Sequence, residues 1–310
     1  MLPDIDIYDD AWVFLLEGSN SVADYYVRRK SVPTASIDGW NRILRARMKY
    51  CNEIGAKYIH IVAPEKLGIY SDKTTLDVQI NSAPVSQIQS GLDEDLVSEI
   101  WINPSDFLRA QKSNYKVYSK TDSHWNFFGA YSSYQLIQSK LGLLVNAKIL
   151  NSSREEKWST MDLGGKFDPP LQEKVHYYSM TDNVQRTYAN PIVEYKESIG
   201  KPNEVGLHVG SHVRYENSDP LIDKKVIIFG DSFSEYREHL LTGMFAETYA
   251  EVNFIWNSSL DKKFITKLNP DVVITELAER FMPKTVPSDQ FCLTEYENKL
   301  ISRYVEQSAA

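Results

Sequence analysis

The stretch Lys225-Val226-Ile227-Ile228-Phe229-Gly230-Asp231-Ser232-Phe233-Ser234 decides the fold class of this 310-residue chain. Its first half is a short, mostly apolar run of the kind that forms a buried strand. We expect the strand to end in a sharp turn at Gly230, followed by a helix that continues to about Phe245. In open α/β proteins, ligands bind beyond the carboxyl ends of such strands. Ser232 is therefore placed where chemistry is expected.

Strands and helices alternate on both sides of this stretch. Periodicity and turn residues predict, in chain order, a helix at 37–55, strands at 58–62 and 115–118, a helix at 127–141, a strand at 252–256, a helix at 262–268 and a strand at 271–274. This order indicates an α/β fold with a mostly parallel sheet and helices on both of its faces. We interpret residues 1–310 as a single domain.

The alternation breaks down between about residues 143 and 223. This segment contains Gly164-Gly165, Pro169-Pro170 and short strand-like runs such as Ile192-Val193-Glu194-Tyr195. We interpret it as an irregular insertion that includes antiparallel strands.

Composition excludes several classes of function. The net charge of −8 and the lack of a Lys/Arg cluster argue against a nucleic-acid partner. Neither a P-loop nor a G-x-G-x-x-G is present, and we expect no metal and no tightly bound cofactor. Cys51 lies on the apolar side of a predicted helix, far from Cys292, which indicates a buried free thiol rather than a disulfide.

The first twenty residues are acidic and contain neither a basic stretch nor a long apolar run. This pattern is typical of neither a signal peptide nor a transmembrane segment. The sequence as it stands predicts a cytoplasmic protein, or a periplasmic one if an export signal has been removed.

Ser232 is the candidate nucleophile. A sharp turn would expose its hydroxyl, and free N–H groups at the start of the following helix could stabilise an oxyanion. A serine hydroxyl is a weak nucleophile without an adjacent base. The segment Thr121-Asp122-Ser123-His124-Trp125-Asn126 supplies one, since Asp122 could orient His124 as it accepts the proton of Ser232.

Each motif also has a purely structural interpretation. Asp231 or Ser232 could cap the helix that follows, and Asp122 or Ser123 could cap the helix at 127–141. The two motifs together, each following a predicted strand, favour the catalytic interpretation.

Gly230–Ser234 (GDSFS), together with Asp122–Asn126 (DSHWN), resembles the paired motifs of the alginate O-acetyltransferase AlgJ/AlgX-type SGNH domain. Weaker similarities extend along nearly the whole chain. They are found at 10–15, where Ala11 replaces the usual Gly, and at 61–66, 161–164, 270–274 and 279–281.

The resemblance implies a three-layer α/β/α sandwich and transfer of an acetyl group to a polysaccharide hydroxyl. It gives Ser232, His124 and Asp122 the roles of nucleophile, base and orienting acid. The acetyl donor would be acetyl-CoA, or an acetyl group relayed by a membrane partner, and the acceptor a glycan. Members of such families are typically exported or membrane-anchored, whereas this chain shows no such signal.

Further candidates surround these three residues. Gly230, Asp231, Trp125 and Asn126 are candidates for oxyanion contacts or for support of the triad. Arg280 is a candidate for substrate binding, with a salt bridge to Glu276 or Glu279 as the alternative.

The remaining histidines are weaker candidates. His208 and His212 could bind a metal from one helix, but Gly210 disfavours that helix. His60 lies within an apolar run and is expected in the core, and no partner is identified for His176 or His239.

Two other functions stay open. The same triad could hydrolyse acetyl esters of sugars, with water as the acceptor. Alternatively, the chain could be a non-catalytic glycan-binding protein that retains the fold.

Overall fold

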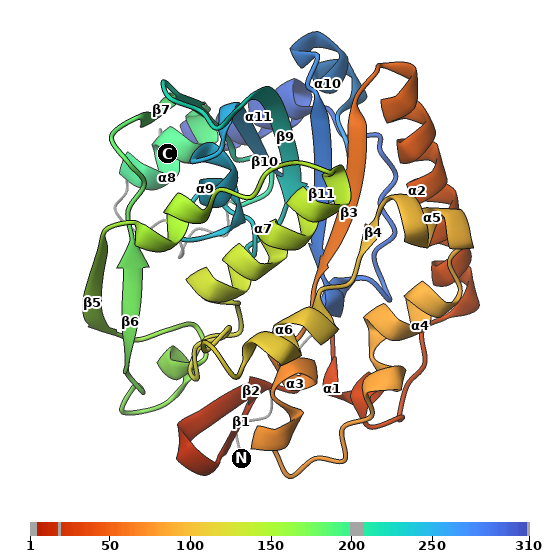
Figure 1. Cartoon of the computed structure of the whole chain (residues 1–310), viewed down its shortest axis with the longest axis vertical. Helices are drawn as coiled ribbons and strands as arrows, with labels where there is room; N and C mark the ends of the chain where they lie inside the picture. Colours follow the sequence, from red (N-terminus) through yellow and green to blue (C-terminus); the bar gives the residue numbers. More distant parts are fainter. Residues whose placement is uncertain (1–4, 18–19, 199–207, 309–310) are drawn as a thin grey trace.

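The computed structural model describes residues 5–17, 20–198 and 208–308. A seven-stranded sheet with the order β4-β3-β11-β9-β10-β8-β7 forms its centre (Figure 1). Five strands are parallel: β3 (Lys57–Ala63), β4 (Trp101–Ile102), β9 (Ile222–Gly230), β10 (Tyr249–Trp256) and β11 (Val272–Ala278). The antiparallel strands β8 (His212–Asn217) and β7 (Val184–Ala189) extend the sheet beyond β10.

Helices cover both faces of the sheet, as the sequence pattern predicts. Their bounds are α1 (Ala23–Tyr26), α2 (Thr34–Glu53), α3 (Lys66–Ile69), α4 (Pro84–Ser90), α5 (Glu94–Glu99), α6 (Ser105–Gln111), α7 (Phe127–Leu141), α8 (Pro191–Ser198), α9 (Leu241–Ala246), α10 (Lys262–Leu268) and α11 (Leu293–Ser308). The predicted end of α7 at Gly142 is confirmed, since this glycine adopts a left-handed conformation with φ of 68°.

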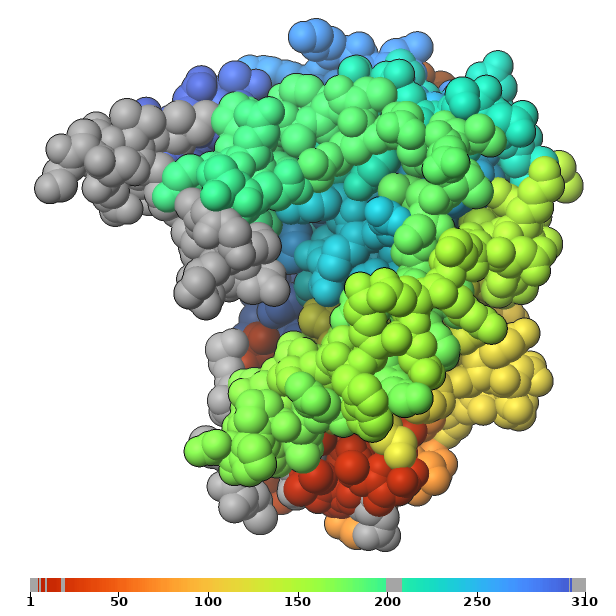
Figure 2. Space-filling model, turned by 90° about the vertical axis from the view of Figure 1, so that its left-hand side faces the viewer, coloured from red at the N-terminus to blue at the C-terminus, as the bar shows by residue number. Residues whose placement is uncertain are grey.

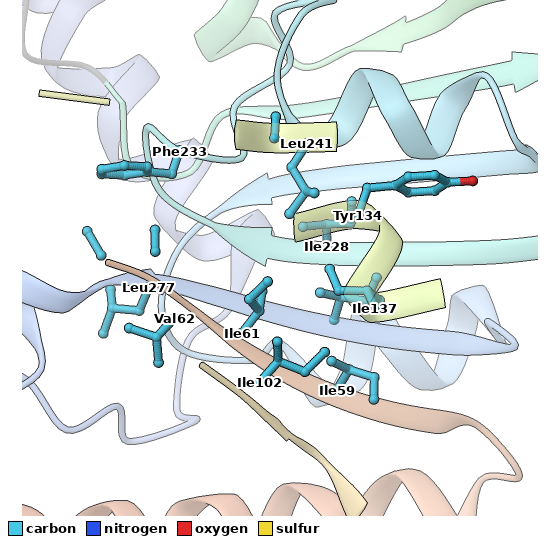
Figure 3. Close-up of a cluster of buried hydrophobic side chains, with 14 of the residues drawn as sticks. Ile59, Ile61, Val62, Ile102, Tyr134, Ile137, Ile228, Phe233, Leu241 and Leu277 are labelled. Atoms are coloured by element: carbon cyan, nitrogen blue, oxygen red, sulfur yellow. The ribbon is translucent and has the colours of Figure 1, made fainter. Parts of the chain in front are cut away.

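Strand β3 shows how the two faces are filled. Ile59 and Ile61 point toward Ile137 of α7 on one face (Figure 3). His60 points to the other face, where its ring centroid lies 5.3 Å from that of Trp40 in α2. His60 is 1% exposed and Cys51 is a buried free thiol, so both sequence predictions are confirmed.

Two predicted strands are wrong. Residues 115–118 form only an isolated bridge between Tyr118 and Trp125, in the loop that precedes α7. The run at 192–195 lies in α8, because Pro191 opens the helix and the Asn190 side chain accepts a hydrogen bond from the Val193 N–H. These helix-start signals outweigh the strand preference of Ile192 and Val193.

The predicted irregular segment at 143–223 does contain antiparallel strands. Strands β5 (Arg154–Ser159) and β6 (Glu173–Tyr178) form a separate hairpin, and β7 and β8 join the central sheet. Residues 199–207 of the segment lie outside the described residues. Figure 2 shows that the segment, in yellow-green and green, covers much of one face of the molecule.

A second small hairpin lies near the N-terminus, with strands β1 (Ile5–Tyr8) and β2 (Trp12–Leu15). Its turn holds Asp10 and Ala11 at φ values of 60° and 59°. Glycine adopts this conformation without strain, which gives a physical reason for a glycine at the position of Ala11 in the resembling family.

Candidate active site

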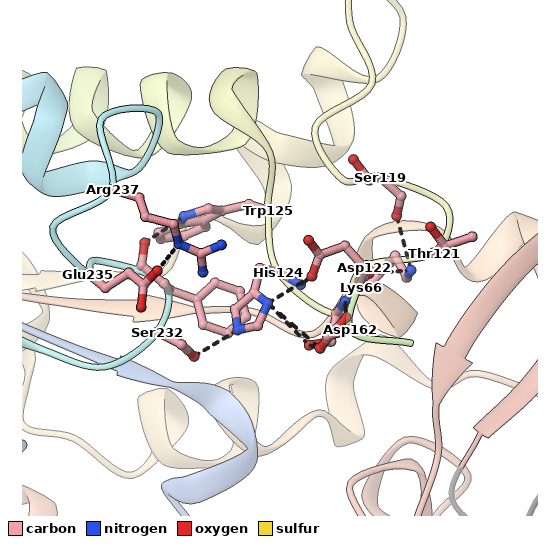
Figure 4. Close-up of polar contacts among 12 residues, drawn as sticks. Lys66, Ser119, Thr121, Asp122, His124, Trp125, Asp162, Ser232, Glu235 and Arg237 are labelled. Atoms are coloured by element: carbon pink, nitrogen blue, oxygen red, sulfur yellow. Dashed lines mark hydrogen bonds and ion pairs between the residues drawn. The ribbon is translucent and has the colours of Figure 1, made fainter. Parts of the chain in front are cut away.

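The structure brings Ser232, His124 and Asp122 together at the carboxyl edge of the sheet (Figure 4). His124 Nε2 lies 2.8 Å from Ser232 Oγ, and His124 Nδ1 lies 2.8 Å from Asp122 Oδ1. The same carboxylate oxygen accepts the backbone N–H of His124 at 3.0 Å. An imidazole that donates from Nδ1 to Asp122 presents the lone pair of Nε2 to the serine, which is the arrangement that a general base requires.

The electrostatics of the pair support this arrangement. Burial favours the neutral imidazole, but the charge and hydrogen bond of Asp122 outweigh it and raise the pKa of His124 above its ordinary value. Burial also opposes the charge on Asp122, yet the attraction and hydrogen bond of His124 lower the pKa of that carboxyl. Asp122 is thus ionised wherever His124 titrates.

Asp231 shapes the turn that carries Ser232. Its Oδ1 accepts the Phe233 N–H at 3.0 Å and its Oδ2 accepts the Ala278 N–H at 2.8 Å, which ties the end of β9 to the end of β11. Gly230 has no room for a side chain, since a Cβ there would lie 2.9 Å from Glu276 Oε2. Both residues position the nucleophile through the backbone.

The helix predicted directly after Ser232 is absent. Residues 232–234 form a turn, and the next helix, α9, begins only at Leu241. The Phe233 amide bonds to the Asp231 side chain and the Ser234 amide to the Asp231 carbonyl. The turn is stabilised by its own side chains, so the predicted helix start at Ser232 is wrong, and the assignment of oxyanion donors stays a prediction.

The loop that carries His124 is held by residues that sequence reasoning did not assign to the site. Asp162 accepts the Ser123 N–H at 2.7 Å and the Ser123 hydroxyl at 2.5 Å, and it lies 3.8 Å from His124 Nδ1. Glu173 of β6 accepts the Thr121 N–H at 2.6 Å. The β5–β6 hairpin and the segment after β5 therefore brace this loop.

Lys66 stabilises the His124 loop by hydrogen bonds to its backbone carbonyls. Its Nζ donates to the carbonyls of Ser119, Lys120 and Asp122 at 3.1, 2.8 and 2.5 Å. The lysine is 2% exposed, and burial lowers its pKa to about 8. The ammonium also lies 5.9 Å from the ring centre of Trp12.

The predicted neighbours Trp125 and Asn126 have structural contacts. Trp125 is 2% exposed, and its Nε1 donates to the Phe233 carbonyl at 2.9 Å, so it links the His124 loop to the Ser232 turn. Asn126 caps α7: its Oδ1 accepts the N–H groups of Phe128 and Gly129, and its Nδ2 donates to the Lys116 carbonyl. The amide of Asn126 is thus engaged with the backbone rather than with an oxyanion site.

Arg280 lies beside the triad, over the Phe233 ring at 5.5 Å from its centre. The sequence alternative, a salt bridge to Glu276 or Glu279, is wrong. The partner of Arg280 is Glu65, with Arg280 Nε 2.6 Å from Glu65 Oε1. Its Nη2 is buried and has no hydrogen-bond partner in the part of the chain that the structure describes. A buried guanidinium with an unused donor is available to a bound group.

The histidine pair proposed for a metal does not share a helix. Gly210 has φ of 85°, and His212 begins β8, where its Nε2 lies 3.0 Å from Asn253 Oδ1. Among the described residues, the one cluster with metal-ligand spacing consists of Asp122, His124 and Asp162. The hydrogen bonds of this cluster already account for its geometry.

Two of the residues that sequence reasoning missed, Glu65 and Lys66, lie at the end of β3. The sequence candidate Arg280 follows β11, which lies between β3 and β9. Parallel strands bring their carboxyl ends to one edge. The charged residues after each predicted strand were therefore a usable signal for Lys66, whereas Asp162 and Glu173 come from an insertion whose packing the sequence does not reveal.

The mostly parallel sheet, with helices on both faces, agrees with the SGNH-like fold that the sequence resemblance implies. Residues 9–183 match the model of the SGNH hydrolase-like domain of the acetyltransferase AlgX. The chain belongs to this family.

Solved structures show the same fold at low sequence identity. Bacillus cereus PatB1 with a sulfonyl adduct is 15% identical, with a TM-score of 0.60 over 91% of this chain and 96% of that one. A DHHW family protein from Eubacterium siraeum is 15% identical, with a TM-score of 0.59 over 91% and 92%. The O-acetyltransferase domain of Pseudomonas putida AlgJ is 13% identical, with a TM-score of 0.54 over 96% and 100%.

No curated protein sequence matches the chain significantly. Within residues 5–17, 20–198 and 208–308, no helix has both the length and the apolar character needed to cross a membrane.

Proposed function

We propose that the chain is an O-acetyltransferase that transfers an acetyl group to a hydroxyl of a polysaccharide through an acetyl-Ser232 intermediate. The observation that carries this proposal is the continuous path from Asp122 through His124 to Ser232, with 2.8 Å at both steps. The chain's membership of the AlgX domain family supports acetyl as the group transferred.

The reaction has two half-reactions. Ser232 Oγ attacks the acetyl carbonyl as His124 Nε2 takes its proton, and the tetrahedral intermediate collapses when the leaving group of the donor receives that proton. A sugar hydroxyl then gives its proton to His124 and attacks the acetyl-serine. The second tetrahedral intermediate collapses as His124 returns that proton to Ser232 Oγ, which releases the acetylated sugar and the free serine. Asp122 stabilises the imidazolium in both halves.

Arg280 is the proposed substrate contact. Its Nη2, which has no hydrogen-bond partner within the described residues, supports a role beside the reacting group. So does its position over Phe233, whose ring centre lies 4.8 Å from that of His124. Its positive charge would attract the acyl oxygen or an acidic sugar.

The alternative function is hydrolysis of sugar acetyl esters, because deacylation by water uses the same triad. The two are distinguished by giving the acetyl-enzyme water alone or water with candidate glycans. Acetyl recovered on the glycan supports the transferase, whereas acetate release that no glycan diminishes would establish the esterase.

The donor is tested in the same assay. Acetyl-CoA that acetylates Ser232 directly would make the chain self-sufficient, whereas acetylation by p-nitrophenyl acetate alone would favour a membrane partner that relays the acetyl group. A third function, glycan binding without catalysis, predicts equal and negligible ester turnover by the wild type and Ser232→Ala.

A further inference from the structure

A cavity of about 320 Å³ lies beside the His124 loop, with Ser119 and Asn126 in its wall. Its walls come from β6, from the segment at 116–119 and from the start of α7. It adjoins the candidate active site, since Asn126 follows His124 by two residues and the Glu173 carboxylate holds the Thr121 amide. Its volume is within the range of small-molecule sites, roughly 300–1,000 Å³.

Aromatic rings line and flank this cavity. Phe127 and Tyr178 stack in its wall with ring centres 3.4 Å apart. Phe128, also in the wall, stacks on Tyr115, which is 43% exposed. On β5, Trp158 is 65% exposed and lies 5.9 Å from the ammonium of Lys174, another wall residue. Flat apolar faces with polar groups nearby are suited to packing against the C–H faces of sugar rings.

The wall also contains a polar group without a partner. Tyr178 is 4% exposed, and its hydroxyl has no hydrogen-bond partner among the residues that the structure describes. A buried hydroxyl that lacks a partner costs stability. A sugar hydroxyl in the cavity would supply one after a small movement of the ring.

The charges of the wall balance. Two lysines, Lys116 and Lys174, accompany two glutamates, Glu156 and Glu173, and the wall also contains His176, whose Nε2 lies 3.9 Å from Glu156 Oε1. Lys174 pairs with Glu156 at 3.0 Å, and Glu173 accepts backbone N–H groups of the His124 loop. With no excess of either sign, the cavity favours a neutral ligand over a polyanion.

We infer that this cavity is a subsite for a neutral hexopyranosyl segment of the acceptor glycan, distant from the sugar that is acetylated. This inference rests on the proposed function, because an extended acceptor must lie on the enzyme beyond the reacting hydroxyl. Trp158 and Phe128 provide the stacking faces, and Tyr178 provides the hydrogen bond that selects a hydroxyl-bearing ring.

The test is calorimetric titration of the full chain with β-linked gluco-, manno- and N-acetylglucosamine hexasaccharides and with a polyuronate hexasaccharide. We expect at least one neutral hexasaccharide to bind, and Trp158→Ala and Tyr178→Phe to weaken that binding by about tenfold. Tyr188→Ala removes a ring that is 40% exposed on β7 and should leave binding unchanged.

Hydrolysis of p-nitrophenyl acetate separates this inference from the proposed function, since so small an ester needs no distant subsite. All three variants should retain wild-type turnover. Binding of the polyuronate alone, or neutral binding that neither Trp158→Ala nor Tyr178→Phe weakens, would overturn the subsite while Ser232-dependent turnover stands. Glycan binding without Ser232-dependent turnover would support the subsite and contradict the acetyl-enzyme.

Discussion

His124 is buried between a carboxylate and a serine hydroxyl, and its protonation state governs the proposed reaction. Asp122 holds the histidine pKa above 6.5 in spite of burial. Since only the neutral imidazole can accept the serine proton, the rate of ester cleavage should rise with pH through an inflection above 6.5.

Asp122→Asn removes the charge that raises this pKa while burial remains. We expect the inflection in the pH–rate profile to move to lower pH and the plateau rate to fall roughly 10²–10⁴-fold. The measurement is p-nitrophenyl acetate hydrolysis between pH 5 and 9. A profile with an unchanged inflection would show that Asp122 does not act on the titrating base.

Lys66 is the second residue with a testable role. Lys66→Met keeps the length of the side chain but leaves the carbonyls of Ser119, Lys120 and Asp122 without their shared donor. We expect the free energy of unfolding to fall by about 3 kcal/mol in urea titrations.

Lys49→Met is the matched control, because the Lys49 side chain is 78% exposed. Its ion pair with Glu53, at i,i+4, is exposed and long, at 3.9 Å between Lys49 Nζ and Glu53 Oε1. Its effect should remain within about 0.5 kcal/mol. Equal decreases in the free energy of unfolding of Lys66→Met and Lys49→Met would contradict the supporting role of Lys66.

At this scale, the sequence identifies the residues whose type and local spacing specify chemistry. Asp122 and His124 are two positions apart, and Ser232 follows a glycine at a strand end, so a local pattern was sufficient to select them. Asp162 and Lys66 act through contacts with a loop that is distant in sequence. No local pattern distinguishes Asp162 from an ordinary surface charge, and the local signal for Lys66 is limited to its place after a predicted strand.

At the scale of elements, α7 is fixed to the His124 loop by close packing at its first turn. A Cβ on Gly129 would overlap the Val117 carbonyl and lie 2.6 Å from Trp125 Cβ. Gly129→Ala should therefore lower the free energy of unfolding by roughly 1–3 kcal/mol, although alanine favours helices.

Gly165→Ala provides the comparison in urea titrations, because a Cβ there meets its nearest neighbour, Thr160 Cγ2, at 3.5 Å. This variant should unfold as the wild type does. A Gly129→Ala protein as stable as Gly165→Ala would show that the packing of α7 on the loop is loose.

Elements with strong periodicity were predicted well, and those decided by tertiary contacts were not. The helix at 262–268 and the strands around 58–62 and 225–229 are confirmed. The helix expected directly after Ser232 begins at Leu241 instead, since Asp231 closes the turn with its side chain and Thr242 donates to the Ser234 carbonyl. Apolar content alone could not reveal that side-chain bonding.

At the scale of the whole molecule, Glu279 joins distant parts of the chain. Its carboxylate accepts the Tyr26 hydroxyl at 2.7 Å and the backbone N–H groups of Glu65 and Val85 at 2.9 and 3.1 Å. Burial raises the pKa of Glu279 from 4.5 to about 7, although the hydrogen bonds from these donors lower it.

A carboxyl with a raised pKa in the folded state contributes more to stability when it is protonated. Its contribution is therefore greatest below pH 4.5 and decreases as pH rises toward 7. Glu279→Gln cannot titrate, so the stability difference between wild type and variant should narrow by a few kcal/mol across this range, about 1.4 kcal/mol per pH unit. A difference that is independent of pH in urea titrations would contradict the raised pKa.

The overall architecture was predictable because strands and helices alternate and the connections of parallel strands obey simple rules. The position of the β5–β6 hairpin against the His124 loop was not, since it depends on contacts such as that between Glu173 and Thr121. The same hairpin forms one wall of the proposed glycan subsite.

The central claim is that Ser232 carries the acetyl group. Intact mass spectrometry of acid-quenched enzyme after brief exposure to p-nitrophenyl acetate tests it directly. We expect a mass increase of about 42 Da, one acetyl group, on the wild type and none on Ser232→Ala. An acetyl group on Ser232→Ala to the same extent, or one located by peptide mapping at another residue of the wild type, would contradict the account.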